Sequence, residues 1–407
     1  MAEAARGRAL VTGIAAVAPN GADTSAFWEA TLTGKSGLRT ISRFNAEDYP
    51  VKIAGLVGLE DGEDCEPRLN VQTDRWTQLA LVAGDRAIAD AGLVPAETPA
   101  YDMAVITASS SGGNEFGQRE IEALWSQGPK SVGPFQSIAW FYAATTGQLS
   151  IKNGMKGPCG VLVAEQAGGL DSLGQAKRAL RRDARVVVTG GTEAPVGPYA
   201  LTCQMASGLL SREPDPQRAY LPFDVDACGY VPGEGGAILI IENEEDALAR
   251  GVDRPYGEIA GYAASFDPRP GSGRPPTLRR AIEGALADAG IGPDEIDVVF
   301  ADGAGVPELD LREAEALAAV FGPRGVPVTV PKALYGRLYA GGPPLDVVAA
   351  LLAIRDGVIP PTYGGSRLAP GCDIDLVREA RHRRVRTALL VARGFEGFNA
   401  ALVVRAV

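Results

Sequence analysis

The segment VLVAEQAGGLDSLGQAKRAL, residues 161–180, decides how this chain folds. It begins with a short apolar run, residues 161–164, typical of a buried parallel strand, and leucines recur at helical spacing from Leu170 onward. The pattern predicts a strand–turn–helix elbow with Gln166 at the turn. Such elbows usually expose a nucleophile, but a carboxamide cannot attack a thioester because its nitrogen is resonance-delocalised. We therefore predict an elbow without its nucleophile.

Small residues follow the turn at Ala167, Gly168 and Gly169. They permit a close approach of the backbone to a ligand, and the free N–H groups at the start of a helix can stabilise an anion. Taken alone, AEQAGG favours a polar turn residue without a functional role at Gln166. Motifs elsewhere in the chain favour a functional interpretation.

Composition excludes several classes of function. The formal net charge of -11 argues against a general affinity for nucleic acid or for an anionic membrane surface, since both require a basic field. The five cysteines are odd in number and form no CxxC pair, so neither a zinc site nor a disulfide framework is expected. No segment reaches the roughly 18 apolar residues of a membrane span. We expect a cytoplasmic globular protein that binds neither nucleic acid nor membranes.

A faint internal repeat relates residues 86–113 to residues 284–305 and aligns Asp90 with Asp288. In each copy a helix that ends in Ala-Asp-Ala-Gly precedes an apolar strand and a loop of small residues. The alternative is that this tetrapeptide is simply a common helix end in an alanine-rich protein. The matching order of elements favours a duplicated α/β architecture with a parallel sheet.

Three separated motifs carry a resemblance to a known family: VTGIAAVAPNG at 11–21, PFDVDACGYVPGEGG at 222–236 and GFEGFNAALVV at 394–404. In this order they resemble the β-ketoacyl synthases of the thiolase fold. The resemblance implies an α/β fold of two duplicated βαβ halves in a layered α-β-α-β-α architecture. We place the halves at residues 1–250, which contain the elbow, and at residues 251–407.

Family catalysis uses a cysteine at the elbow and two histidines, and the resemblance places other residues at all three positions. Gln166 replaces the cysteine, Asp302 in ADGAGV replaces one histidine, and Arg337 in KALYGR replaces the other. Of the family's residues at these motifs, Lys332 remains. A site with two histidines is impossible here, because His382 is the single histidine of the chain and is expected on the surface. Among the thiols near these motifs, Cys159 and Cys228 are expected to be buried and inert.

The combination of VAEQAGGLD, FADGAGVPELD and KALYGRLYAGGPPLDV looks like the chain-length factor, or ketosynthase beta subunit, of aromatic type II polyketide synthases. The resemblance implies a catalytically silent subunit that forms a heterodimer with a cysteine-bearing ketosynthase alpha and sets the length of a poly-β-ketone. It implies no directly bound cofactor. The acyl chains arrive on the phosphopantetheine arm of an acyl carrier protein.

The replaced site allows several interpretations. Asp302 can accept a hydrogen bond from Lys332 or Arg337, and the resulting ion pair either stabilises a vestigial site or retains some activity. The Gln166 carboxamide resembles an acylated cysteine and is a candidate for malonyl decarboxylation. The alternatives are therefore a malonyl-carrier-protein decarboxylase that supplies the primer and an autonomous condensing enzyme with an unrecognised nucleophile. A third alternative is a scaffold that plays no part in the tunnel that, by the resemblance, holds the growing poly-β-ketone.

The resemblance also implies a tunnel gate after the loop TASSSGG, at Asn114, Gly117 and Ile121. At a spacing of i, i+3 and i+7 these residues share one face of a helix, as they do in any plain amphipathic helix. In the family that the chain resembles, members with short products tend to have bulky aromatic gates, so the resemblance implies that Gly117 and Ile121 allow a chain of about ten acetate units or more.

Two runs of arginine are candidates for docking the acidic carrier protein. They consist of Arg178, Arg181, Arg182 and Arg185, and of Arg381, Arg383, Arg384 and Arg386. Capping and solubility are the favoured explanation for both runs, and for the first run they suffice because cations near a helix C-terminus interact favourably with its dipole.

Overall fold

The computed structural model describes residues 7–63, 65–269 and 271–407. Its strands are β1 (Ala9–Val17), β2 (Leu38–Thr40), β3 (Ile53–Gly55), β4 (Met103–Ala108), β5 (Cys159–Leu162), β6 (Val186–Glu193), β7 (Gly235–Asn243), β8 (Gly257–Phe266), β9 (Val298–Phe300), β10 (Pro327–Thr329), β11 (Val358–Ile359), β12 (Asp375–Leu376), β13 (Arg381–His382), β14 (Thr387–Arg393) and β15 (Phe398–Arg405). Its α-helices are α1 (Thr24–Thr33), α2 (Pro67–Asn70), α3 (Arg75–Asp90), α4 (Asn114–Gln127), α5 (Gln136–Ala139), α6 (Ala144–Lys152), α7 (Gly168–Leu180), α8 (Pro198–Met205), α9 (Glu244–Ala249), α10 (Leu278–Ala289), α11 (Pro307–Phe321) and α12 (Gly342–Asp356).

Among the described residues, eleven strands form one mixed sheet in the order β12-β10-β9-β14-β15-β8-β1-β7-β6-β4-β5. Each half repeats one pattern, in which a first strand pairs antiparallel with a long return strand and the remaining strands run parallel. The halves join where β1 pairs with β8, with Leu10 opposite Glu258. This confirms the predicted duplication.

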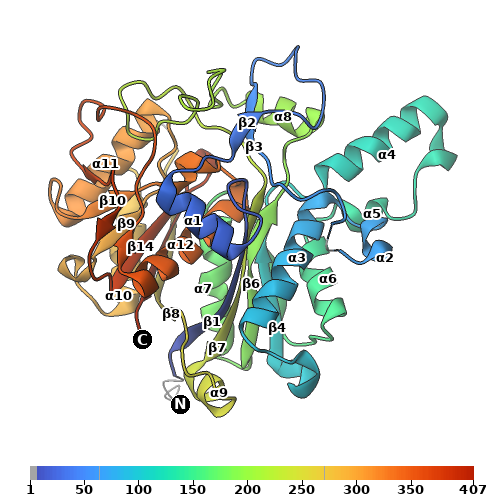
Figure 1. Ribbon diagram of the computed structural model, residues 1–407, viewed down its shortest axis with the longest axis horizontal. Coiled ribbons are helices and arrows are strands. Elements are labelled where there is room, and N and C mark those ends of the chain that lie inside the picture. The colour runs from blue at the N-terminus through green and yellow to red at the C-terminus, as the bar shows by residue number, and fades with distance from the viewer. Residues whose placement is uncertain (1–6, 64, 270) are drawn as a thin grey trace.

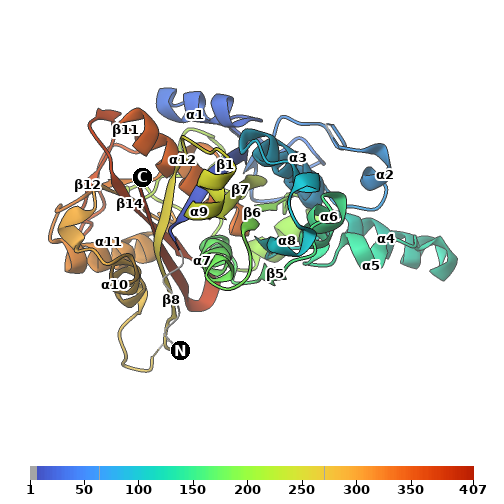
Figure 2. The ribbon, with the colours of Figure 1, turned by 90° about the horizontal axis from the view of Figure 1, so that it is seen from below.

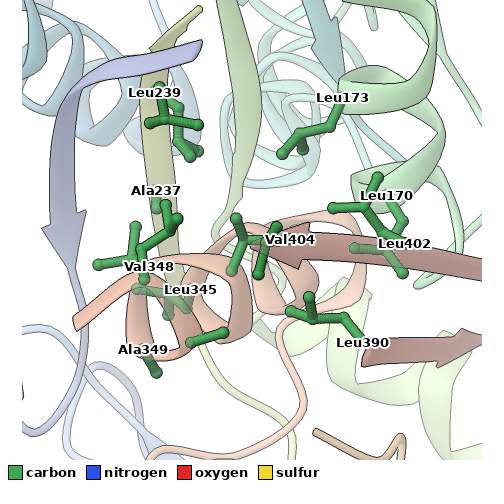
Figure 3. Close-up of a cluster of buried hydrophobic side chains, with 14 of the residues drawn as sticks. Leu170, Leu173, Ala237, Leu239, Leu345, Val348, Ala349, Leu390, Leu402 and Val404 are labelled. Carbon is green, nitrogen blue, oxygen red and sulfur yellow. The ribbon is translucent and has the colours of Figure 1, made fainter. Parts of the chain in front are cut away.

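The helices lie in three layers, one between the two halves of the sheet and one on the outer face of each half (Figures 1 and 2). The side chains of α7 and α12 form one core with strands of both halves, whereas α3 covers the outer face of the first half and α10 and α11 cover that of the second. Figure 3 shows Leu170 and Leu173 of α7 in the central layer, together with Leu345 and Val348 of α12 and Leu239 of β7. Burial of each such leucine contributes about 1.5–3 kcal/mol. The layered α-β-α-β-α architecture is confirmed.

The two aspartates that the repeat aligned occupy equivalent places. Asp90, the last residue of α3, accepts a hydrogen bond from the N–H of Ile14 in β1 at 2.8 Å. Asp288, near the end of α10, accepts one from the N–H of Tyr262 in β8 at 3.0 Å. Each carboxylate therefore fastens a helix of one half to the first strand of that half, which explains why the tetrapeptide recurs.

A glycine precedes each of these hydrogen-bonded strand residues and lets the helix lie close. A Cβ atom at Gly13 would come within 2.4 Å of the Ala87 carbonyl oxygen, and one at Gly261 within 2.1 Å of the Ala285 carbonyl oxygen. Real Cβ contacts are longer, so a side chain at either position would push the helix off the sheet. The duplication thus extends to the packing of the backbone.

Several segments adopt the structure that is typical of their sequence pattern. The apolar run VVVTGG lies in β6, the segment GGPP leads into α12, and the C-terminal segment forms the hairpin of β14 and β15. His382 is exposed on β13, as expected. The glycine- and proline-rich segment at residues 267–277 links β8 to α10 as an exposed loop, in which residue 270 lies outside the described residues.

Other predictions are wrong. The apolar run at residues 161–164 is not a buried strand, because β5 ends at Leu162 and forms an edge of the sheet, and the Val163 side chain is 53% exposed. Cys159 and Cys228 are exposed and not buried. An apolar pattern indicates an environment that excludes water, but it does not tell whether this chain or a partner supplies it. No helix among the described residues is long and apolar enough to cross a membrane.

The predicted boundary between residues 250 and 251 falls between α9 and β8. Because the sheet is continuous from β1 to β8 across the two halves, the division at this residue stays a prediction.

Candidate functional site

The turn and the helix of the elbow are built as the sequence predicts, although the strand before them is an exposed edge strand. Glu165, at the turn between β5 and α7, has a φ of 50°, a left-handed conformation that is strained for a residue with a side chain. Gln166 follows directly and leads into α7. A Cβ atom at Gly169 would lie 2.6 Å from the Ala340 carbonyl oxygen, so only glycine lets α7 approach the segment before α12 this closely. This is the geometry that presents a nucleophile in other elbows.

The Gln166 side chain is completely buried and points toward the start of α12. A Cβ atom at Gly342, the first residue of α12, would lie 3.3 Å from its Nε2 atom. Neither the Oε1 nor the Nε2 atom of Gln166 has a hydrogen-bond partner among the described residues. Buried polar atoms normally have partners, and leaving one unpaired costs about 1–3 kcal/mol. The N-termini of α7 and α12 thus converge on an unpaired carboxamide.

The two histidine positions hold a buried ion pair. Arg337 donates from Nη1 to Oδ2 of Asp302 at 2.7 Å, and it also donates from Nη2 to the Arg393 carbonyl oxygen. The other oxygen of Asp302 accepts the Arg393 N–H at 3.0 Å. Burial lowers the pKa of Arg337, but the carboxylates of Asp302 and Glu165 raise it, and the net pKa lies well above its usual value. The guanidinium is therefore permanently charged and held in place.

Lys332 has a different partner. Its ammonium group lies 2.8 Å from Oδ2 of Asp346 in α12 and donates to the Ala301 carbonyl oxygen at 2.7 Å. The hydroxyl of Tyr335 donates to the other oxygen of Asp346 at 2.7 Å. Burial raises the pKa of Asp346 although Lys332 opposes this rise. Of the two predicted partners of Asp302, the structure thus selects Arg337, whereas Lys332 pairs with Asp346 of the central helix α12.

Buried acids that the sequence analysis missed surround the site. Glu313 accepts the N–H groups of Asp302 and Gly303 at 2.7 and 2.9 Å, and Glu165 accepts the N–H of Phe395 at 2.9 Å. Burial raises the pKa of both acids. Each carboxylate fixes a loop that borders the replaced site, and no local sequence signal distinguishes these glutamates from surface ones.

Glu193 is a further buried acid, at the end of β6. It accepts hydrogen bonds from the backbone of Ser110 and Ser111 and from the hydroxyl of Ser111. Burial raises the pKa of Glu193 to about 8. This contact anchors the loop before α4, which carries the predicted gate. The one sequence signal for Glu193 is its position as a charged residue at the end of a buried apolar strand.

The three gate positions lie on one face of α4, which extends away from the body (Figure 1). Gly117 is buried, Asn114 is half-buried, and Ile121 is 52% exposed. A Cβ atom at Gly117 would lie 3.8 Å from Nε2 of Gln136 and 3.9 Å from Cβ of Trp140, which is ordinary contact. The helical arrangement agrees with the predicted spacing, while the role of these residues as a gate stays a prediction.

Acids partner several of the arginines that were candidates for docking. Arg185 donates to Asp246 at 2.7 Å, and Arg381 donates to Asp375 at 2.6 Å. The guanidinium of Arg178 lies 5.5 Å from the centre of the Tyr262 ring. These contacts favour structural roles over docking for the arginines involved.

The arrangement limits the chemistry of the site. Gln166, Asp302 and Arg337 offer a neutral amide and a closed ion pair, and they provide neither a thiolate nor an imidazole. Acyl transfer by a condensing enzyme requires an activated nucleophile. Among the described residues, no group of three or more histidine, cysteine or acidic side chains is arranged to hold a metal ion. The elbow thus keeps the framework of a condensing enzyme without its reacting groups.

Comparison with known proteins agrees with this geometry. Residues 8–247 match the family "Beta-ketoacyl synthase, N-terminal domain", and residues 256–366 match "Beta-ketoacyl synthase, C-terminal domain". The chain is 54% identical over 398 residues to the actinorhodin polyketide putative beta-ketoacyl synthase 2 of Streptomyces coelicolor, covering 97% of this chain and 98% of the relative. It is 55% identical over 399 residues to the tetracenomycin polyketide synthase ketoacyl synthase beta subunit of Streptomyces glaucescens, with the same coverage.

Solved structures show the same fold. The ishigamide ketosynthase/chain length factor matches with a TM-score of 0.90 and 27% identity, covering 99% of this chain and 100% of the other. A type II PKS ketosynthase, solved in complex with its acyl-carrier protein and bound to the hexaketide, matches with a TM-score of 0.87, 27% identity and the same coverage. From its motifs, its replaced site and these relatives, the chain belongs to the β-ketoacyl synthase family and, within it, to the ketosynthase beta subunits, or chain-length factors, of type II polyketide synthases.

Proposed function

We propose that this chain is the catalytically silent subunit of a heterodimeric ketosynthase and sets the length of the poly-β-ketone that its partner builds. One observation carries the proposal. The turn and helix of the elbow are present, but Gln166 stands at the position of the nucleophile, and the two histidine positions are joined in the ion pair of Asp302 and Arg337. A chain that keeps the tunnel-forming fold and lacks the reacting groups is suited to shape a product that another subunit makes.

The proposed partner is a cysteine-bearing ketosynthase alpha. Strand β5 forms an edge of the main sheet that no other described strand covers, and exposed apolar side chains are concentrated from α4 to the end of β5. These side chains are Ile121, Trp125, Ile138, Trp140, Phe141, Ile151 and Val163. Unpaired strand edges and exposed apolar side chains are typical of surfaces that another chain covers. They support a heterodimer in which α4 lies at or near the interface.

In this heterodimer the gate on α4 limits chain growth. Gly117 provides no bulk at the gate, and a Cβ atom at this position would make only ordinary contact with Gln136 and Trp140. We therefore propose a long product of about ten acetate units or more, since aromatic gates occupy far more volume than glycine. The growing chain arrives on the phosphopantetheine arm of an acyl carrier protein, so this subunit binds no cofactor of its own. We infer a cytoplasmic location for the complex.

Mass spectrometry of products from malonyl-loaded carrier protein tests the proposal. Three reactions are compared: this chain alone, a cognate ketosynthase alpha alone, and the two together. We expect full-length polyketide from the pair and none from this chain. Condensation by this chain alone would contradict the proposal, because it would require a nucleophile other than the residue at the elbow.

A second function, decarboxylation of malonyl carrier protein, is favoured by the unpaired Gln166 carboxamide where two helix N-termini converge. In this step the bond between the carboxylate carbon and the α-carbon breaks, carbon dioxide leaves, and the electron pair forms the thioester enolate. Water then protonates the enolate to give acetyl carrier protein. The N–H groups at the elbow and the Gln166 amide can stabilise the enolate oxygen.

Carbon dioxide release from malonyl carrier protein, measured with this chain alone, tests the second function. This second function requires release above background that Gln166→Ala abolishes. A rate that does not differ between the two proteins would remove this function and leave the proposed role in chain length intact.

A further inference from the structure

The position of α4 depends on few contacts. The helix has 14 residues, and only Phe116 and Gly117 of these are buried. Figures 1 and 2 both show it extending beyond the rest of the molecule. Its first turn therefore largely sets its direction. At a rise of 1.5 Å per residue the helix is about 21 Å long, so a tilt of about 10° at the first turn moves the far end by about 4 Å.

A chain of ion pairs leads from the buried core to this first turn. Glu234, which is 1% exposed, receives Arg75 in a two-pronged contact at 2.8 and 2.9 Å. Arg75 also donates from Nη1 to Oδ1 of Asp61 at 2.7 Å. Arg43 donates from Nη1 to the same Asp61 oxygen at 3.3 Å and from Nη2 to Oε2 of Glu115 in α4 at 3.0 Å. We call these five residues, Glu234, Arg75, Asp61, Arg43 and Glu115, the root network.

A second contact acts at the same turn. Asp74 caps the N-terminus of α3 through the N–H of Trp76 at 3.2 Å, and its other oxygen accepts the N–H of Phe116 in α4 at 2.7 Å. One carboxylate thus joins the starts of two helices. The direction of α4 relative to α3 is consequently fixed by polar contacts at its base.

The space beside these contacts is polar and is not filled by apolar side chains. A cavity of about 130 Å³ lies between α3 and α4, lined among others by Asp61, Asp74, Arg75, Glu115 and Arg119. On this side, therefore, α4 is held by ion pairs and hydrogen bonds more than by apolar packing. Two further polar contacts of α4 involve Gln118, which accepts the Tyr199 N–H at 3.0 Å, and Glu120, which accepts the Gly133 N–H.

We propose that Arg43 and Glu115 are positioning residues for the gate. They fix the direction of α4 and thereby the width of the tunnel at the gate, where a tilt of about 10° moves Ile121, seven residues beyond the start of the helix, by about 2 Å. This inference rests on the proposed role in chain length, and it assigns product fidelity to a contact that touches neither the reacting atoms nor the predicted gate residues.

The test uses the heterodimer with its carrier protein and measures the distribution of product masses. We expect Arg43→Ala and Glu115→Ala each to lower the ratio of the main product to all other lengths two- to five-fold. That range corresponds to about 0.4–1 kcal/mol for a partly buried ion pair, at 1.4 kcal/mol per factor of ten. The double variant should be no worse than either single variant, because both substitutions remove the same contact. Arg43→Lys, which keeps the charge, should restore most of the ratio.

Two controls separate the possible results. Glu120→Ala removes a contact between α4 and the loop that follows it, away from the first turn, and should leave the ratio unchanged. Gly117→Phe alters the gate itself. If Gly117→Phe shifts the product while Arg43→Ala and Glu115→Ala do not, the positioning role is refuted and the proposed function stands. If Gly117→Phe also leaves the product unchanged, the role in chain length fails, and the positioning role fails with it.

Discussion

Substitution of Asp302 by asparagine tests the buried ion pair that replaces the two histidines. The Asp302 side chain is 1% exposed and that of Arg337 is 8% exposed, so Asp302→Asn leaves a buried guanidinium beside a neutral amide. Removing one partner of a buried pair costs about 3–5 kcal/mol of unfolding free energy. Asparagine still offers an oxygen to the Arg393 N–H, and Glu165 also favours the charged Arg337. We therefore expect a loss near the lower limit, about 3 kcal/mol.

The assay is chemical unfolding followed by circular dichroism for the wild type, Asp302→Asn, Arg337→Met and the double variant. The double variant removes both charges and should regain most of the lost stability, since replacing a whole buried pair by neutral groups is often nearly neutral. Arg279→Ala, which breaks the exposed pair with Glu283, is the matched control and should cost no more than about 0.5 kcal/mol. Single losses below about 1 kcal/mol that simply add in the double variant would refute the argument.

The remaining predictions concern the gate, a buried acid and the elbow. Gly117→Phe should shorten the polyketide, because its ring must enter the space toward Gln136 and Trp140, and an unchanged product mass counts against the gate. Burial raises the pKa of Glu193 from 4.5 to about 8. Between these two pH values the folded protein therefore holds a proton that the unfolded chain releases. The contribution of Glu193 to stability is complete below pH 4.5 and is lost as the pH rises to about 8. Glu193→Gln should therefore flatten the fall of unfolding free energy across this range, and an identical pH profile for both proteins contradicts the assignment. Gln166→Cys alone should not yield polyketide without a partner, since an ion pair still fills the histidine positions, and product from that variant would show that the ion pair does not block condensation.

Much of the fold was predictable because local patterns carry it. The period of the apolar residues predicted the helix after the elbow, and the repeated tetrapeptide aligned Asp90 with Asp288. The structure gives these two aspartates the same hydrogen bond in both halves. The replacement of the nucleophile by Gln166 was equally visible, since residue identity and motif order do not depend on packing.

Surface and core were less predictable. The run at residues 161–164 and Cys159 were predicted to be buried, yet they lie at or beside the edge strand β5. Residues in such a strand can be apolar because a second chain covers them, and one sequence does not distinguish the two cases. Ile121 is likewise exposed because α4 extends away from the rest of the molecule, which the sequence does not reveal.

The sequence by itself determined the elements, the duplicated halves and the loss of the nucleophile, because these follow from short-range periodicity and from residue identity. Only the tertiary structure decided which buried charges pair. Arg337 joins Asp302, Lys332 joins Asp346, and the root network reaches Glu115 across residues that lie far apart in the chain. A buried charge pairs with the group that packing brings within a few ångströms, because the exclusion of water strengthens the attraction between charges at that distance. The distance is set only when the layers of helices and strands pack together.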